Sequence, residues 1–265
     1  MTDDDRAKRQ KLIGHGSGLV GAAAGGALGF IAEGPIGAGI LASAAYLIAP
    51  TLERITLEMC SRVLSSRETM RVGAAIALAE TVIRERLDRG DRPRDDGFFT
   101  RDGTDRSAAD QLYEGVLLKC QKEHQEKKLR HIASIFANAA FLDISATDAN
   151  AVLLIAERLS YRQMCLVAAV GGDSGFPGFV WCSDIDGMAN QLNYHNEIVL
   201  SEDFVQLWTF IRLIGGPMTA ATRLEDGHVG LTSLGEMCFT LMDLAKVPQT
   251  DVNPIVASFR AAVVR

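Results

Sequence analysis

The stretch "GSGLVGAAAGGALGF", residues 16–30, decides how the beginning of this chain is interpreted. It holds Gly16, Gly18 and Gly21 in the G-x-G-x-x-G spacing of a dinucleotide-binding turn. Such a turn needs a buried strand before its first glycine and a helix after its last. Residues 3–15, "DDDRAKRQKLIGH", are mostly charged and contain no such strand. The context therefore argues against a phosphate-binding loop.

The glycines of this segment recur every fourth residue and would form one smooth helix face. In water, each glycine inside a helix costs about 1 kcal/mol relative to alanine. In lipid, the backbone must bond internally, and glycine lets two helices approach each other closely. We therefore expect residues 1–50 to form a glycine-zipper membrane hairpin, with an oligomerisation face and pore made by Gly18, Gly21, Gly25, Gly29 and Glu33.

The two halves of this expected hairpin are separated by the breaker Glu33-Gly34-Pro35. As helices they would be about 25 Å and about 21 Å long, which is shorter than the hydrocarbon core of roughly 30 Å. These lengths leave two arrangements open, a hairpin that spans the core and one that only dips into it. Basic residues on both flanks predict that the bulk of the chain lies in the cytoplasm. Three alternatives are a cleaved secretory signal, a glycine-rich hairpin buried in a soluble protein, and a disordered leader.

The cysteines and the net charge indicate the redox compartment of the protein and restrict the ligands that its surface can bind. The five cysteines are odd in number and form no C-x-x-C pair, as expected in a reducing compartment. The formal net charge of -6 argues against a surface devoted wholly to nucleic acid.

Residues 51–158 read as a helical cytosolic domain. Apolar residues recur at helical spacing, with Leu52, Ile55, Met59 and Val63 on one stripe. Ser107 is predicted to cap the next helix. The inward face of this helix and of the block that follows it is predicted to consist of Leu112, Val116, Leu117, Cys120, Leu129, Ile132, Ile135 and Phe136. Between the helices, residues 88–106 form a polar loop in which we expect Phe98 and Phe99 to dock on the core.

Positive charge collects in the second half of this domain. One interpretation is a salt-bridged, solvent-facing helix. The other is an anion-binding surface, because clustered ammonium and guanidinium groups attract phosphates. The candidate ligand-binding residues are Lys119, Lys122, Lys127, Lys128 and Arg130, with Arg101 and Arg106 of the preceding loop.

Residues 159–265 resemble a winged-helix module. The pattern gives three helices, then a strand, the turn Asp226-Gly227, a second strand and a closing helix. The first of these helices is expected to begin at Ser160 and to run from Tyr161 to Val170. The presumed recognition helix carries Glu202 and Asp203, and its acidity disfavours contact with phosphates. We expect an oligomerisation or docking unit, with DNA binding as the alternative. The predicted fold class is thus mainly α, with a small β-wing.

Catalytic motifs are lacking in the sequence. It contains no G-x-S-x-G elbow, Walker A run or H-E-x-x-H pair. His124 and His131 lack a third metal ligand at suitable spacing. We expect a protein that is not an enzyme and uses no cofactor or metal.

Several stretches together resemble a group of uncharacterised bacterial proteins with a glycine-rich membrane segment and a helical cytosolic part. They are "RDDGFF" (94–99), "YEGVLLKCQKEHQEKKLRHIASIFAN" (113–138), "LSYRQMCLV" (159–167) and "LTSLGEMCFTLMDL" (231–244). The layout is also similar to membrane effectors of antiphage defence, among them the ion-channel effector of the Hailong system. That resemblance implies an oligomeric channel controlled by a nucleic-acid oligomer that a partner nucleotidyltransferase makes.

The resulting hypothesis is a homo-oligomer in contact with the lipid of a bacterial inner membrane, the localisation that the resemblance implies. It has a cation-favouring ring of Glu33 at its pore and binds a polyanionic, oligonucleotide-type signal on its cytosolic domain. One alternative is a soluble winged-helix regulator that binds DNA through Arg212 or Arg223. Another is a peripheral membrane scaffold that does not conduct ions.

Overall fold

The computed structural model describes residues 2–24, 42–101, 103, 105–172, 203, 206, 207, 211, 213–215 and 230–263. The described chain is mainly helical, which confirms the predicted mainly α class. It divides into two compact units, Met1–Arg158 and Leu159–Arg265. The first unit joins the residues assigned above to a leader, 1–50, and to a helical domain, 51–158.

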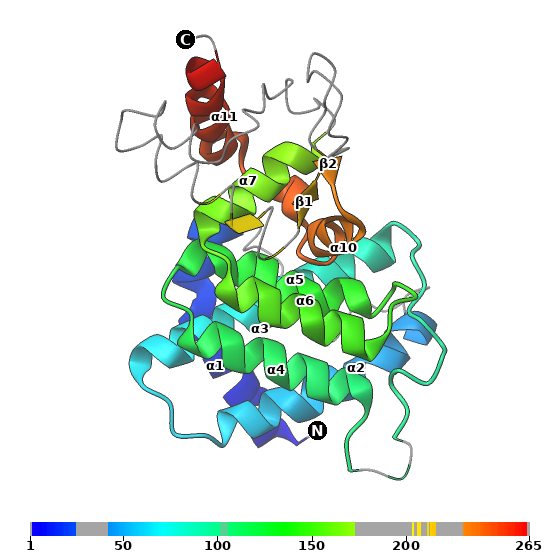
Figure 1. Ribbon diagram of the computed structural model, residues 1–265. Coiled ribbons are helices and arrows are strands. Elements are labelled where there is room, and N and C mark those ends of the chain that lie inside the picture. Colours follow the sequence, from blue (N-terminus) through cyan, green and yellow to red (C-terminus); the bar gives the residue numbers. More distant parts are fainter. Residues whose placement is uncertain are drawn as a thin grey trace. The chain divides into compact units, whose positions relative to one another are not determined.

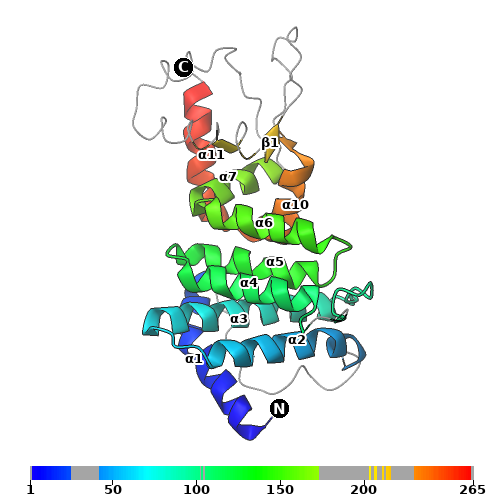
Figure 2. The ribbon, with the colours of Figure 1, turned by 60° about the horizontal axis from the view of Figure 1, so that its bottom comes forward.

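The first unit is a helical assembly built around the central helix α3 (Figure 1). Its elements are α1 (Asp3–Ala24), α2 (Ala42–Cys60), α3 (Ser66–Asp88), α4 (Ala108–Lys122), the 3₁₀ turn η2 (Glu126–Lys128), α5 (Leu129–Ala139) and α6 (Ala146–Arg158). Helix α3 packs against α1, α4 and α5, and α6 packs against α4 and α5. Figure 2 shows α2, α3 and α4 following one another across this unit.

Local sequence signals begin these helices. Ser65 caps α3 in a capping box with Glu68, and Ser107 caps α4 in a box with Asp110. In each box the serine hydroxyl accepts the backbone N–H three residues on, and the carboxylate accepts the serine N–H. The predicted cap at Ser107 is therefore confirmed.

The core of the first unit lies where α3, α4 and α5 meet. The inward face predicted for α4 and α5 is buried, and the Tyr113 and Phe136 rings lie 4.5 Å apart at its centre. Phe98 is also buried, with its ring edge-to-face against Phe99 at 5.1 Å. Val63 departs from the expected stripe because α2 ends at Cys60, which leaves Val63 in the connecting loop and fully exposed.

Helix α1 carries the beginning of the glycine-rich stretch against α3. Leu12 and Ile13 are buried, and Arg9 Nη2 lies 2.5 Å from Glu80 Oε1. Gly16 lies so close to α3 that an added Cβ would overlap the Ala74 amide nitrogen and the Gly73 carbonyl carbon. Gly14 and Gly18 face open space. The close approach thus involves Gly16, and the expected zipper face with Gly18 points away from α3.

The expected inner-membrane localisation is corrected by this arrangement. Among the described residues, no helix has both the length and the apolar character that crossing a bilayer requires. Helix α1 begins with Asp3, Asp4 and Asp5, and its glycine contact is with another protein helix. Of the expected pore residues, Gly18 and Gly21 lie in α1, while Gly25, Gly29 and Glu33 lie outside the described residues.

The second unit contains α7 (Tyr161–Gly171), β1 (Ile214–Gly215), β2 (Gly230–Leu231), α10 (Ser233–Leu241), the 3₁₀ turn η4 (Leu244–Lys246) and α11 (Gln249–Val263). Helix α7 starts at the cap Ser160, where a helix was predicted. Strands β1 and β2 pair antiparallel, with Ile214 opposite Leu231. The expected second helix, Arg212, Arg223 and the Asp226-Gly227 turn lie outside the described residues.

Contacts within the second unit hold α10 and α11 near α7. Gly235 of α10 lies against the Leu213 carbonyl, where an added Cβ would overlap that oxygen. Tyr161 donates its hydroxyl to Asp251 Oδ2 at 2.8 Å, which joins α7 to α11. Burial and this hydrogen bond raise the pKa of the Tyr161 phenol far above its usual value.

Candidate functional site

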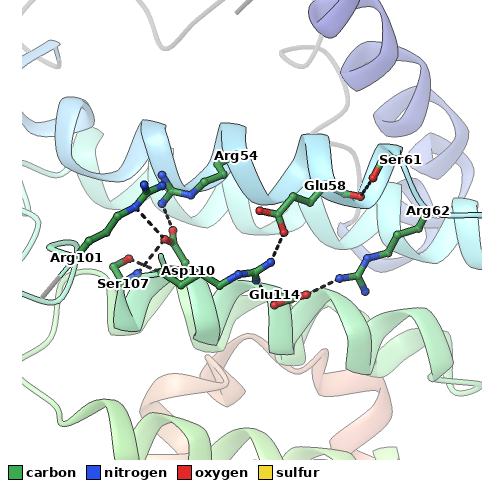
Figure 3. Close-up of polar contacts among 9 residues, drawn as sticks. Arg54, Glu58, Ser61, Arg62, Arg101, Ser107, Asp110 and Glu114 are labelled. Atoms are coloured by element: carbon green, nitrogen blue, oxygen red, sulfur yellow. Dashed lines mark hydrogen bonds and ion pairs between the residues drawn. The ribbon is translucent and has the colours of Figure 1, made fainter. Parts of the chain in front are cut away.

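Charged side chains join α2 to α4 in a network that we call the ionic seam (Figure 3). At one end of the seam, Asp110 has a fully buried side chain and forms an ion pair with Arg54 of α2. Arg101 Nε lies 3.9 Å from Asp110 Oδ2. Because Asp110 also closes the capping box with Ser107, one carboxylate connects α2, the polar loop and the start of α4.

The rest of the ionic seam is built on Arg106. Its guanidinium pairs with Glu58 of α2 and with Glu114 of α4, and Glu114 also pairs with Arg62. The network therefore alternates in sign along the contact between the two helices. The sequence-based hypothesis used Arg54 and Arg62 only as part of the basic flank after the expected hairpin and gave Glu58 no role, whereas the structure places all three in ion pairs. Nothing local in the sequence indicates that residues about 50 positions apart meet here.

The contacts in the ionic seam determine the pKa of Asp110. Burial raises the pKa of this carboxyl, but hydrogen bonds from Arg54, the Ser107 backbone and Thr51 outweigh burial and hold the pKa below 3.8. The group is therefore a charged structural partner at neutral pH. Its geometry gives no sign of a general acid or base.

The predicted ligand-binding cations fall into two places. Arg101 and Arg106 lie in the loop before α4 and belong to the ionic seam, where they pair with Asp110 and Glu114 of α4. Lys119 and Lys122 lie in the last turn of α4, about 14 Å and about 18 Å from Asp110 along the helix axis. The structure thus does not bring all seven predicted residues into one site.

The remaining cations gather with two further arginines where α3 begins, α4 ends and η2 leads into α5. We call this surface the basic corner, and it comprises Arg67, Arg71, Lys119, Lys122, Lys127, Lys128 and Arg130. Arg67 pairs with Glu126 of η2, and Arg71 Nη1 lies 3.5 Å from the Gln121 carbonyl oxygen of α4. These two contacts bring the start of α3 to residues that are more than 50 positions away in the chain.

The members of the basic corner differ in exposure. Lys122 and Lys127 are exposed, and Lys119 is partly exposed and paired with Glu157 of α6. Lys128 is 2% exposed, so its ammonium group faces the protein interior. Lys128 therefore has a different task from the lysines around it.

Lys128 holds together the turn beneath the basic corner. Its Nζ lies 2.6 Å from Glu123 Oε2 and donates to the Glu157 carbonyl oxygen at 3.2 Å. Glu123 Oε1 in turn accepts the Gln125 backbone N–H at 2.8 Å. The buried pair thus fixes the chain between α4 and α5 and ties it to the end of α6.

The charge of the basic corner is positive. Its cations outnumber the neighbouring carboxylates, which are Glu68, Glu123, Glu126 and Glu157. Hydrogen bonds from Ser65 and Gln121 lower the pKa of Glu68 to about 2, so this carboxylate is also occupied within the protein. The surplus lies on a chain whose formal net charge is -6.

Within the part of the chain that the structure describes, no group of three or more His, Cys, Asp or Glu residues is arranged to hold a metal ion. Comparisons of the chain with protein-family models, with curated proteins and with solved structures find no match.

Proposed function

We propose that this protein is a non-catalytic regulator that binds an oligonucleotide-type polyanion at the basic corner. The observation that carries the proposal is the surplus of cations at the meeting point of α3, α4 and η2 on an otherwise acidic chain. Clustered positive groups raise the local potential and attract phosphates. Binding at this surface needs no bond-making step, in keeping with a protein that is not an enzyme.

The spacing of the exposed cations favours a chain of phosphates over a single one. Lys119 and Lys122 lie one turn apart at the end of α4, and Lys127 follows in η2. A flexible single strand places successive phosphates along such a row, and each contact releases a counterion. Arg101 and Arg106 are not part of the proposed site, because their guanidinium groups hold the ionic seam.

In this proposal the second unit mediates the response to ligand binding by contacting other protein chains. We propose that residues 159–265 form a winged-helix-like oligomerisation or docking unit, supported by the antiparallel pairing of β1 with β2 before α10. The sequence resemblance supports a role in antiphage defence, with the signal made by a partner nucleotidyltransferase. The pore of the sequence-based hypothesis is not carried forward, because it depended on the corrected localisation.

Fluorescence anisotropy with a labelled oligoadenylate hexamer tests the proposal. Wild-type protein is expected to bind the hexamer with an affinity that falls steeply as salt is raised. The K122E/K127E variant reverses two exposed charges and is expected to lose most of this binding. Duplex DNA serves as a comparison ligand, because the rival winged-helix regulator would prefer it.

The K8E/K11E variant is the matched control. It makes the same charge change on exposed lysines of α1, toward the end of α3 that lies away from the basic corner, as the Arg9–Glu80 pair indicates. Equal loss of binding in the two variants would show that net charge alone is responsible. Unchanged hexamer binding by K122E/K127E would refute the proposed site.

A further inference from the structure

The basic corner carries two carboxylates that already occupy its cations. Glu126 pairs with Arg67, and Glu157 pairs with Lys119. The side chains of these four residues retain between 27% and 55% of their accessible surface. Ion pairs this exposed contribute little stability, so a phosphate group can take the place of either carboxylate.

The backbone behind Glu157 is fixed independently of its carboxylate. The buried ammonium of Lys128 donates to the Glu157 carbonyl oxygen at 3.2 Å and is itself held by Glu123. When the Glu157 carboxylate leaves Lys119, the end of α6 therefore remains attached to the turn. Only a side chain has to move, and no helix must unfold.

These contacts impose a condition on the ligand. A single phosphate that replaces one carboxylate exchanges one anion for another and gains little. A ligand with several phosphates displaces Glu126 and Glu157 and also reaches Lys122 and Lys127, which are exposed beside them. The net gain thus grows with the number of phosphates that the ligand presents.

We infer that Glu126 and Glu157 are built-in competitors of the ligand, which mask the basic corner and lower its affinity for each phosphate that replaces them. This inference rests on the proposed function and adds what limits the binding of a polyanion at this site. The two glutamates act by competition for Arg67 and Lys119.

The test compares a hexamer of oligoadenylate with adenosine monophosphate on the wild type and on E126Q/E157Q. Removing both carboxylates is expected to tighten hexamer binding by about tenfold. Binding of the mononucleotide is expected to tighten by less, because a single phosphate displaces one carboxylate whereas the hexamer displaces both. The ratio of hexamer affinity to mononucleotide affinity is therefore expected to rise in the variant.

The D95N/D143N variant is the control for charge, because it neutralises two exposed carboxylates in loops away from the basic corner. An affinity ratio in E126Q/E157Q equal to that of this control overturns the inference, while hexamer binding by the wild type leaves the proposed function standing. Failure of the wild type and both variants to bind the hexamer at low salt, with native thermal melts, overturns the proposed function itself. Binding that appears only in E126Q/E157Q supports the masking role.

Discussion

Gly16 of α1 and Gly73 of α3 meet backbone to backbone. A Cβ on Gly16 would overlap the Gly73 carbonyl carbon, and a Cβ on Gly73 would overlap the Leu12 carbonyl oxygen. The two helices approach this closely because neither contributes a side chain at the contact. The glycine-rich leader thus owes this part of its structure to a neighbouring helix.

Substitutions at Gly16 and Gly18 are expected to have opposite effects on stability. G16A is expected to lower the free energy of unfolding by about 3 kcal/mol, because the methyl group meets backbone atoms that cannot yield without moving a helix. G18A is expected to raise it by up to about 1 kcal/mol, since an added Cβ there meets open space within a helix. Urea unfolding followed by circular dichroism measures both, and a stable G16A protein would contradict the close contact.

Loss of the Asp110 charge is expected to destabilise the ionic seam in a pH-dependent way. D110N leaves Arg54 without its buried partner and is expected to lower the free energy of unfolding at neutral pH by about 3 kcal/mol. The pKa of Asp110 is lower in the folded protein than the ordinary 3.8, so its contribution is complete above that value and disappears as the pH falls through the folded pKa.

The difference in stability between wild type and D110N is therefore expected to shrink when unfolding is measured below about pH 4. Glu68 does not affect this difference, because it is present in both proteins. Hydrogen bonds from Ser65 and Gln121 lower its pKa from 4.5 to about 2, so its protonation in acid destabilises both proteins. A difference that stays constant between neutral and acidic pH would contradict the role of the ionised carboxylate.

The buried pair beneath the basic corner is expected to behave as a unit. K128M leaves the Glu123 carboxylate buried without its ammonium partner and is expected to cost about 3 kcal/mol or more. The double variant E123L/K128M removes both charges and is expected to recover much of that loss. A double-mutant cycle in urea tests this, with K119M as a control expected to cost less than about 1 kcal/mol, because its pair is partly exposed.

Cysteine reactivity is expected to follow burial. Burial raises the pKa of the Cys120 thiol well above its usual range and that of Cys238 to about 12, so little reactive thiolate forms at about pH 8. Cys60 is only half-buried, and we expect it to react with iodoacetamide before Cys120 and Cys238. Peptide mapping by mass spectrometry determines the order in which the cysteines are modified. Early modification of Cys120 would contradict its buried position.

Features that depend on a few neighbouring residues could be predicted from the sequence. The capping boxes at Ser107 and Ser160 involve partners three residues on, and the inward face of α4 follows from helical spacing. The predicted docking of Phe98 is confirmed as well.

Features that depend on distant partners could not be predicted in the same way. The glycine spacing in residues 14–29 indicates close packing but does not say whether lipid or protein lies opposite. The partner of Gly16 is the small-residue run at Gly73 and Ala74, nearly 60 residues later. The small side chains of "VGAA" at 72–75 are a signal of close packing, but the sequence does not say which helix packs there.

The candidate site also combines features that the sequence predicts with features that depend on distant residues. The run of lysines predicted positive charge near residues 119–130, and the structure adds Arg67 and Arg71 from α3. Sequence spacing could not assign Arg106 to Glu58 and Glu114, or bury Lys128 against Glu123, because these pairings arise only when the helices are assembled. Whether a lysine is available to a ligand is thus a tertiary property.

The close contact between α1 and α3 also limits where the chain can be shortened or tagged. An unbroken run of α3, from Val72 to Ala79, is buried, and α1 covers the part of it around Gly73 and Ala74. Trimming the chain beyond Gly16 would bare this surface to water, and aggregated material, rather than a smaller native protein, is the expected product. An affinity tag is best joined through a flexible spacer ahead of Asp3, so that α1 remains packed against α3.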